Sequence, residues 1–192
     1  EYDLAIKIGI DPKMIIVNGP YKTKKALEKF VLGESIVNLD SYIEVDFLKE
    51  IAKNHPSKQL KVGVRCNFEI NDDLKSRFGF DVESDSFSCM FSQVSNIDNI
   101  TIDGIHCHFP NRDLQSYDYR VDKILELAKK LFTAPPKYID IGGGFFGKME
   151  ESLKAQFGTP TVEYGEYANL IATKFKAAYQ DYSDDEKPAL LL

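Results

Sequence analysis

The residues best suited to chemistry are three consecutive glycines, Gly142, Gly143 and Gly144, which follow the apolar segment 138–141. Glycine has no Cβ, so the backbone amides of such a run can turn toward a small anion without steric cost. Phosphate is the anion that nests of this kind most often hold. The pattern therefore predicts a phosphate site at a strand end; the simpler alternative is a tight turn that needs positive φ.

The same glycines allow a second interpretation. Gly142, Gly144 and Gly147 spell G-x-G-x-x-G after a strand, which is the pattern of dinucleotide-binding loops. That pattern requires a helix that opens at once and an acidic residue at the end of the next strand. Glu163 and Glu166 follow at about the required 20 residues, but within a helical pattern. We therefore prefer a phosphate site of another kind and keep the dinucleotide loop as the alternative.

Two histidines alternate in the segment 100–109, which reads as a strand. His106 and His108 would then lie on the same face. Such a pair can ligate a metal, but the whole chain has only three histidines, and we predict no metal site. The other uses are a buried structural histidine, or an imidazole stacked on an aromatic cofactor ring, for which His108 is the candidate.

Arg65 also stands at the end of a predicted strand. A guanidinium fixed there can bind a carboxylate or a phenolate oxygen. An ordinary ion pair is an equally good interpretation of the same residue.

Composition excludes several classes of protein. The formal charge of −6 argues against a nucleic-acid partner, which requires a basic face. No apolar run approaches the length of a membrane span, so we expect no membrane segment. The three cysteines, Cys66, Cys89 and Cys107, have neither CxxC nor metal-ligand spacing. They indicate free thiols in a reducing compartment, and we expect a cytoplasmic protein.

Strand-like and helical segments alternate along the chain with short connections. Strand patterns cover 13–18, 35–39, 60–67, 100–109, 138–141 and 189–192, and helical patterns cover 1–9, 24–32, 41–51, 84–94, 117–132 and 162–179. Asp40 or Ser41 is the expected cap of the third helix, with Glu44 completing a capping box. We interpret the apolar stripe of 117–132 as core.

This alternation predicts parallel strands with helices outside. Polar and glycine-rich residues repeatedly follow the strands, as at the carboxyl-terminal face of a TIM-type barrel. We therefore expect an incomplete α/β fold of the (β/α)₈ barrel type rather than an open doubly wound sheet. About six of the eight units are expected, with the first strands missing, and residues 1–192 are predicted to form one barrel-domain fragment.

Two of these strand ends resemble a known family. Gly104-Ile105-His106-Cys107-His108 and the segment from Asp140 through Gly142-Gly143-Gly144 to Gly147 resemble motifs of pyridoxal 5'-phosphate (PLP) enzymes with the alanine-racemase-like barrel. The ornithine/diaminopimelate decarboxylase group is the more similar one. Lys22, Asp40-Ser41, Arg65 and Arg77-Phe78-Gly79 are similar to landmarks of that group and occur in the same order.

The resemblance implies PLP as the cofactor and gives roles to six residues. His108 would stack on the pyridine ring, and Arg65 would lie near its phenolic oxygen. Gly142, Gly143 and Gly144 would hold the phosphate through backbone amides, Gly144 most directly. Asn111 stands where the family has a serine that touches the phosphate, and its side chain could still donate a hydrogen bond.

The resemblance also implies a function. The whole protein is expected to decarboxylate a small-molecule amino acid and to form a homodimer. A racemase or lyase on the same barrel and a catalytically silent PLP-binding relative are the alternatives. The Schiff-base lysine, the glutamate that pairs with the pyridine nitrogen and a C-terminal β-domain are expected outside residues 1–192. No catalytic residue is therefore predicted in this segment, and the chain alone is expected to be inactive.

Overall fold

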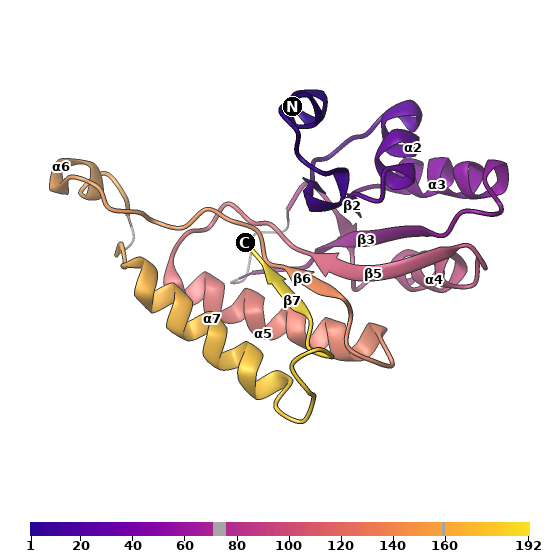
Figure 1. Cartoon of the computed structure of the whole chain (residues 1–192). Coiled ribbons are helices and arrows are strands. Elements are labelled where there is room, and N and C mark those ends of the chain that lie inside the picture. The colour runs from indigo at the N-terminus through magenta and orange to yellow at the C-terminus, as the bar shows by residue number, and fades with distance from the viewer. Residues whose placement is uncertain (71–75, 159) are drawn as a thin grey trace. The chain divides into compact units, whose positions relative to one another are not determined.

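The computed structural model describes residues 1–70, 76–158 and 160–192, and it divides into two compact units. The first unit contains Glu1–Phe68 and Ser76–His106, and the second contains the segment Cys107–Leu192. Figure 1 shows the elements of both units and labels most of them.

The first unit is a parallel sheet with helices between its strands. In chain order its elements are α1 (Tyr2–Lys7), a 3₁₀ turn (Pro12–Met14), β1 (Ile16–Val17), α2 (Lys24–Leu32), β2 (Ile36–Leu39), α3 (Tyr42–Asn54), β3 (Leu60–Asn67), β4 (Phe80–Asp81), α4 (Asp85–Ser95) and β5 (Ile100–His106). The strand order is β1-β2-β3-β5, every pair is parallel, and β4 pairs with β3. The crossovers along the order β1-β2-β3-β5 pass through the helices α2, α3 and α4, as is usual for parallel neighbours.

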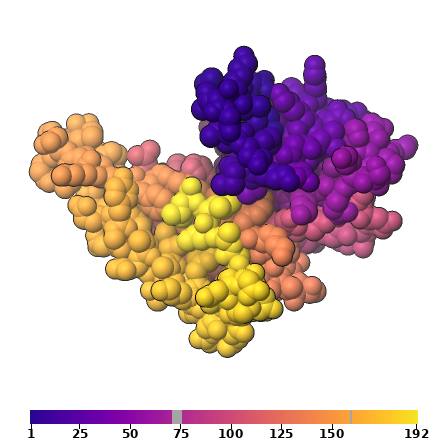
Figure 2. All heavy atoms as spheres, viewed as in Figure 1, coloured from indigo at the N-terminus to yellow at the C-terminus, as the bar shows by residue number. Residues whose placement is uncertain are grey.

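The core of this unit comes from the apolar faces of its helices. Leu27 on α2, Leu48 on α3 and Val94 on α4 are fully buried, and so are Val37 and Val64 on the strands. Near the N-terminus the ring centroids of Tyr2 and Phe30 lie 4.5 Å apart. Figure 2 shows the indigo N-terminal atoms against the purple atoms of the segment that follows.

The second unit is built on two long helices and two short parallel strands. Its elements are α5 (Leu114–Leu131), β6 (Tyr138–Asp140), α6 (Glu151–Lys154), α7 (Tyr164–Ala178) and β7 (Ala189–Leu191). β6 pairs with β7 in parallel, with Ile139 opposite Leu190. The helices α5 and α7 run side by side, as Figure 1 shows, and Lys174 on α7 lies 2.6 Å from both Asp118 and Asp122 on α5.

Several predicted boundaries are corrected. β5 ends at His106 rather than at residue 109, so His108 lies in the loop that follows and not on a strand. The predicted 13–18 strand shortens to β1, because Asp11 caps a 3₁₀ turn over Pro12–Met14. α5 begins at Leu114 rather than at residue 117, since the Asp113 carboxylate accepts a hydrogen bond from the Ser116 amide.

Two short elements were not expected. β4 lies in the predicted loop 68–84, part of which is outside the described residues, and α6 lies between the glycine-rich segment and α7.

The predicted capping box of α3 does not form. The Ser41 hydroxyl makes no cap hydrogen bond, although Ser41 is the N-cap residue. Glu44 does turn back, but it accepts from the Asp40 amide at 2.8 Å and from the Lys22 amide at 2.6 Å. Glu44 therefore joins the start of α3 to the loop before α2.

Candidate cofactor site

The glycine run forms an irregular loop directly after β6. Gly142 and Gly144 have φ values of +67° and +97°, a region that side chains with a Cβ rarely adopt. The Gly142 amide donates to the Asp140 carboxylate at 2.9 Å, so the last residue of the strand turns the chain. The run therefore needs glycine for its backbone conformation at two of its three positions.

Gly142 also allows a close approach between two loops. A Cβ at this position would lie 2.6 Å from His108 Nδ1 and 2.7 Å from the Cys107 carbonyl oxygen. The Cys107 amide donates to the Asp140 carbonyl at 2.8 Å and holds the same segments together. Gly142 thus brings the exposed His108 imidazole against the glycine loop, while its own amide is used by Asp140.

Gly143 and Gly144 are placed differently. A Cβ on either residue would meet no atom within 4 Å, and Gly144 is exposed. Within the described part of the chain, neither amide has a hydrogen-bond acceptor. These two backbone N–H groups can therefore receive an anion beside His108.

The buried Arg120 and the half-buried Asn111 form a polar pair in the same unit. Arg120 is fully buried, and its Nη2 donates to the Asn111 carbonyl oxygen at 2.6 Å. Among the described residues, Arg120 Nε, Arg120 Nη1 and Asn111 Oδ1 have no hydrogen-bond partner. Buried polar atoms without partners are rare in native proteins, and they call for a ligand or an ordered water.

Tyr117 joins this pair to the glycine loop. Its hydroxyl donates to the Gly143 carbonyl oxygen at 2.8 Å, and the Arg120 guanidinium lies 3.9 Å from its ring centre. The Phe145 ring also stacks on the phenol, with a centroid distance of 4.7 Å. Burial raises the pKa of Tyr117 to about 12, although the nearby Arg120 charge opposes the shift, so the hydroxyl remains a donor.

The sequence analysis assigned the apolar face of the helix at 117–132 to the core and did not identify Tyr117 or Arg120 as site residues. They do lie on the buried face of α5, as the periodicity indicated. The available signal was a phenol and a guanidinium three residues apart on that face, because buried polar groups require partners.

Arg65, the candidate in the first unit, is held by an ion pair. Its Nη1 donates to Asp40 Oδ2 at 2.8 Å, and the other oxygen of Asp40 accepts from the Gly79 amide at 2.9 Å. The guanidinium lies 5.4 Å from the Phe78 ring centre, and the residue is 7% exposed. The ion-pair interpretation is therefore confirmed, and the Arg77-Phe78-Gly79 segment serves to orient this side chain.

Lys22 belongs to the same buried network. Its Nζ lies 3.1 Å from Glu44 Oε2 and donates to the Gly19 carbonyl at 3.0 Å. The side chains of Lys22 and Glu44 are 4% and 0% exposed. Lys22 is thus fully engaged in holding the loops that follow β1 and β2.

The dinucleotide alternative fails on local structure. No helix opens at the glycine run: the next helix is α6, which begins at Glu151. Glu166 accepts a hydrogen bond from the Glu163 amide at 2.9 Å, so this acidic pair caps α7 and does not stand at a strand end. The metal interpretation also lacks support, since the described residues contain no group of three or more His, Cys, Asp or Glu placed to hold an ion.

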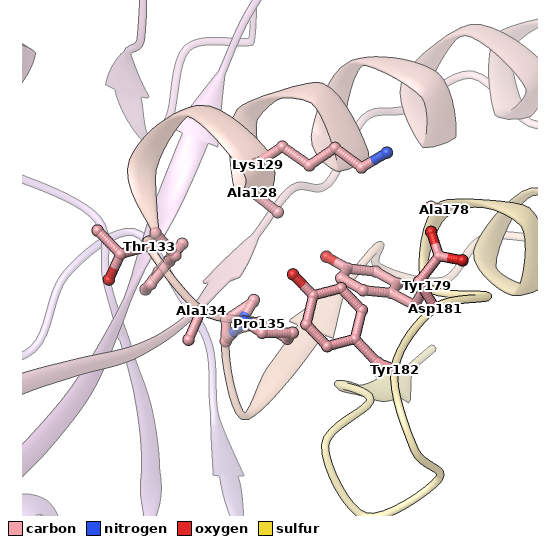
Figure 3. A pocket seen from close by; sticks show the side chains of 11 residues that line it. Ala128, Lys129, Thr133, Ala134, Pro135, Ala178, Tyr179, Asp181 and Tyr182 are labelled. Carbon is pink, nitrogen blue, oxygen red and sulfur yellow. The ribbon is translucent and has the colours of Figure 1, made fainter.

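A separate pocket of about 320 Å³ lies at the other end of α5 (Figure 3). Its lining includes Lys129, Pro135, Tyr179 and Tyr182, as Figure 3 shows. Tyr117 lies eleven residues before Ala128 on the helix, a distance of about 16 Å along the axis. The pocket is therefore distinct from the cluster around the glycine loop.

Comparison with known proteins decides the family. Residues 1–191 match the family model described as the pyridoxal-binding domain of pyridoxal-dependent decarboxylases. The chain belongs to this family. Pyridoxal 5'-phosphate is accordingly the cofactor of the domain, and the open amides of Gly143 and Gly144 fit its phosphate.

Individual relatives agree with the family. The chain is 33% identical to diaminopimelate decarboxylase of Aquifex aeolicus over 158 residues, which is 75% of this chain and 37% of that protein. It is 29% identical to a probable ornithine decarboxylase of Dictyostelium discoideum over 81% of this chain and 34% of that protein. The chain therefore spans less than half the length of these relatives.

Solved structures establish the fold. Diaminopimelate decarboxylase of Methanocaldococcus jannaschii superposes with a TM-score of 0.77 at 22% identity, over 100% of this chain and 45% of that one. Arginine decarboxylase of Paramecium bursaria Chlorella virus gives a TM-score of 0.71 over 99% of this chain and 48% of that one, also at 22% identity. The predicted incomplete (β/α)₈ barrel is confirmed.

Two further expectations concern membrane-spanning helices and the cysteines. None of the helices in the described ranges is long and apolar enough to cross a membrane. Cys66 and Cys107 are buried free thiols, whereas Cys89 is exposed.

Proposed function

We propose that this chain is the cofactor-binding domain of an amino-acid decarboxylase. The observation that carries the proposal is the pair of open amides at Gly143 and Gly144 beside the exposed His108, in a chain that matches the pyridoxal-binding family model over residues 1–191. The match runs through both compact units, which supports a single functional domain over residues 1–192.

In this proposal the second unit binds the phosphate and the ring. The Gly143 and Gly144 amides donate to the phosphate, and the Asn111 side chain adds a donor from the preceding loop. Gly142 contributes by its lack of a side chain, which admits His108 to the loop. His108 offers the flat face of its imidazole to the pyridine ring, an arrangement that aromatic groups favour.

Arg65 keeps the role that the resemblance implies, near the phenolic oxygen of the ring. Asp40 and the Phe78-Gly79 segment fix the direction of its guanidinium, which suits it to a phenolate oxygen on the cofactor. When bound, PLP acts as the electron sink: it accepts the electron pair of the bond to the carboxylate, which leaves as carbon dioxide. The residues of this chain bind and orient it.

The proposed substrate is an amino acid whose side chain carries a basic group. Diaminopimelate decarboxylase of M. jannaschii has been crystallised with L-lysine, and the viral arginine decarboxylase with agmatine. Loss of carbon dioxide from diaminopimelate leaves lysine and from arginine leaves agmatine, and both compounds carry basic nitrogen groups at the two ends of a carbon chain.

The alternatives are a racemase or lyase on the same barrel and a silent PLP-binding relative. The silent relative is favoured by the residues after His108, where the resemblance leads one to expect a glycine and a phosphate-contacting serine and the chain has Phe109-Pro110-Asn111, with Asn111 at the place of the serine.

We further propose that the whole protein is a cytoplasmic homodimer and that this chain alone is inactive. The buried free thiols of Cys66 and Cys107 support a reducing compartment. The engagement of Lys22 by Glu44 and Gly19 supports inactivity, because this buried lysine is not available to bind the cofactor covalently. Sedimentation of the full-length protein tests the dimer.

The deciding experiment is performed on the full-length protein. PLP is added, the visible absorbance is recorded, borohydride traps the cofactor on the lysine that binds it, and the labelled peptide is mapped. We expect a label on a lysine outside residues 1–192, and release of carbon dioxide from ornithine, lysine, arginine or diaminopimelate. A label on Lys22 would contradict the role given to Glu44. No label and no carbon dioxide would leave the silent relative.

A further inference from the structure

Tyr117 controls the direction of one amide in the glycine loop. Its hydroxyl donates to the carbonyl oxygen of Gly143 at 2.8 Å. That carbonyl and the Gly144 N–H belong to one planar peptide unit, in which C=O and N–H point in opposite directions. A hydrogen bond that fixes the Gly143 oxygen on the Tyr117 side therefore aims the Gly144 N–H away from Tyr117.

This constraint matters because glycines flank the peptide on both sides. Gly144 has φ +97°, and a glycine backbone can adopt several alternatives of similar energy. Without an external hydrogen bond the peptide plane is free to rotate. The Tyr117 side chain supplies such a hydrogen bond to the Gly143–Gly144 peptide.

Arg120 fixes Tyr117 and a second loop at the same time. The two residues are three positions apart and so lie on one face of α5. The guanidinium covers the phenol ring at 3.9 Å, while its Nη2 holds the Asn111 carbonyl oxygen at 2.6 Å. One helix face therefore connects the loop that contains Asn111 with the loop that contains Gly143 and Gly144.

Aromatic packing leaves the phenol little freedom. Phe145 stacks on Tyr117 with an interplanar angle of 21°, and Tyr167 meets its ring edge-on at 5.1 Å. The Tyr167 hydroxyl in turn donates to the Arg112 carbonyl oxygen. The ring that carries the hydroxyl is thus clamped from several sides.

The charge of Arg120 is an independent sign of an anion. The residue is fully buried, and no carboxylate among the described residues pairs with it. Its Nε and Nη1 hydrogens have no acceptor in the described part of the chain. Burying an uncompensated cation is costly, and a phosphate dianion nearby reduces that cost.

We propose that Tyr117, held by Arg120, is a positioning residue that presets the Gly143–Gly144 peptide for the phosphate of the cofactor. The inference rests on the proposed function and adds to it a second layer of residues behind the phosphate. Neither side chain needs to touch the phosphate: Tyr117 acts through the backbone, and Arg120 acts through Tyr117 and through Asn111.

The test compares PLP with pyridoxal, which lacks the phosphate, in titrations of the full-length protein. Tyr117→Phe removes the hydroxyl and keeps the stacked ring. We expect its Kd for PLP to rise about 3- to 10-fold, the range for one lost hydrogen bond, with the Kd for pyridoxal unchanged. Tyr119→Phe is the matched control, because Tyr119 is exposed on the same helix, and it leaves both constants unchanged.

Arg120→Met provides a second variant that keeps most of the side-chain volume and removes the charge. We expect the same selective weakening of PLP, which covers the case in which Tyr117→Phe fails to fold. Equal weakening of PLP and pyridoxal, or no change in either variant, overturns the positioning role. A wild-type protein that binds no PLP refutes the proposed function instead, so the two failures are distinguishable.

Discussion

The two compact units contain buried charged residues in opposite states. In the first unit Lys22 is paired with Glu44, and Arg65 with Asp40, with separations of 3.1 Å and 2.8 Å. In the second unit Arg120 is also buried. None of the residues that the structure describes pairs a carboxylate with it, and its Nε and Nη1 lack hydrogen-bond acceptors. The first network is paired within the protein, whereas the second leaves buried donors that a ligand or an ordered water can satisfy.

This difference distinguishes charged groups that already have a protein partner from groups that still offer donors to a ligand. A buried ion pair is stable when hydrogen bonds also satisfy its remaining atoms, as the Asp40, Lys22 and Gly79 amides do for the first network. A site that must accept a phosphate cannot be saturated by its own protein atoms. Incomplete pairing in the second unit is therefore what a binding role requires.

The largest expected effect comes from opening the completed network. Glu44→Gln removes the charge that Lys22 needs, and we expect it to lower the free energy of unfolding by about 3–5 kcal/mol. Urea unfolding of the full-length protein measures this change in the free energy of unfolding. The control is Asp184→Asn, which breaks an exposed pair with Lys187 and should cost at most about 1 kcal/mol. Similar small losses in both variants would remove the distinction between the two regions.

A smaller effect on stability, but a larger one on binding, is expected at Gly142. Gly142→Ala adds a Cβ at φ +67°, which costs about 1–2 kcal/mol, and places it against His108 Nδ1. Displacement of His108 should raise the Kd for PLP at least about tenfold, equivalent to about 1.4 kcal/mol. Titration with PLP measures the change.

Gly165→Ala is the matched control for that variant. Gly165 lies in α7 with open space around it, and alanine is preferred there by about 0.5–1 kcal/mol. We expect unchanged affinity and slightly higher stability. Tight PLP binding by Gly142→Ala would show that His108 need not contact the glycine loop.

The smallest effect is confined to alkaline pH. Burial raises the pKa values of Tyr117 and Tyr179 to about 12, above the ordinary value of about 10 for an unfolded chain. Their protonated forms therefore stabilise the fold fully below about pH 10, and this contribution is lost as the pH rises through about 12. Tyr117→Phe and Tyr179→Phe should each make the fall in unfolding free energy between these values shallower. A fall as steep as in the wild type would contradict the effect of burial.

In both regions the sequence predicted which elements form more accurately than where they end. Apolar periodicity and turn residues predicted the order of strands and helices, because burial of one face follows directly from side-chain spacing. Element ends were less accurate: β5 stops at His106, and α5 starts at Leu114, where Asp113 caps it. Caps and strand ends depend on hydrogen bonds that spacing alone does not specify.

The sequence by itself determined the family, the cofactor and the loop that follows β6, because contiguous motifs encode them. Only the tertiary structure decided how that loop is supported. Tyr117 and Gly143 are 26 residues apart, and Asp40 and Gly79 are 39 residues apart. Periodicity shows that a residue is buried but not which polar atom it meets, and that pairing is fixed only when the helices and strands pack.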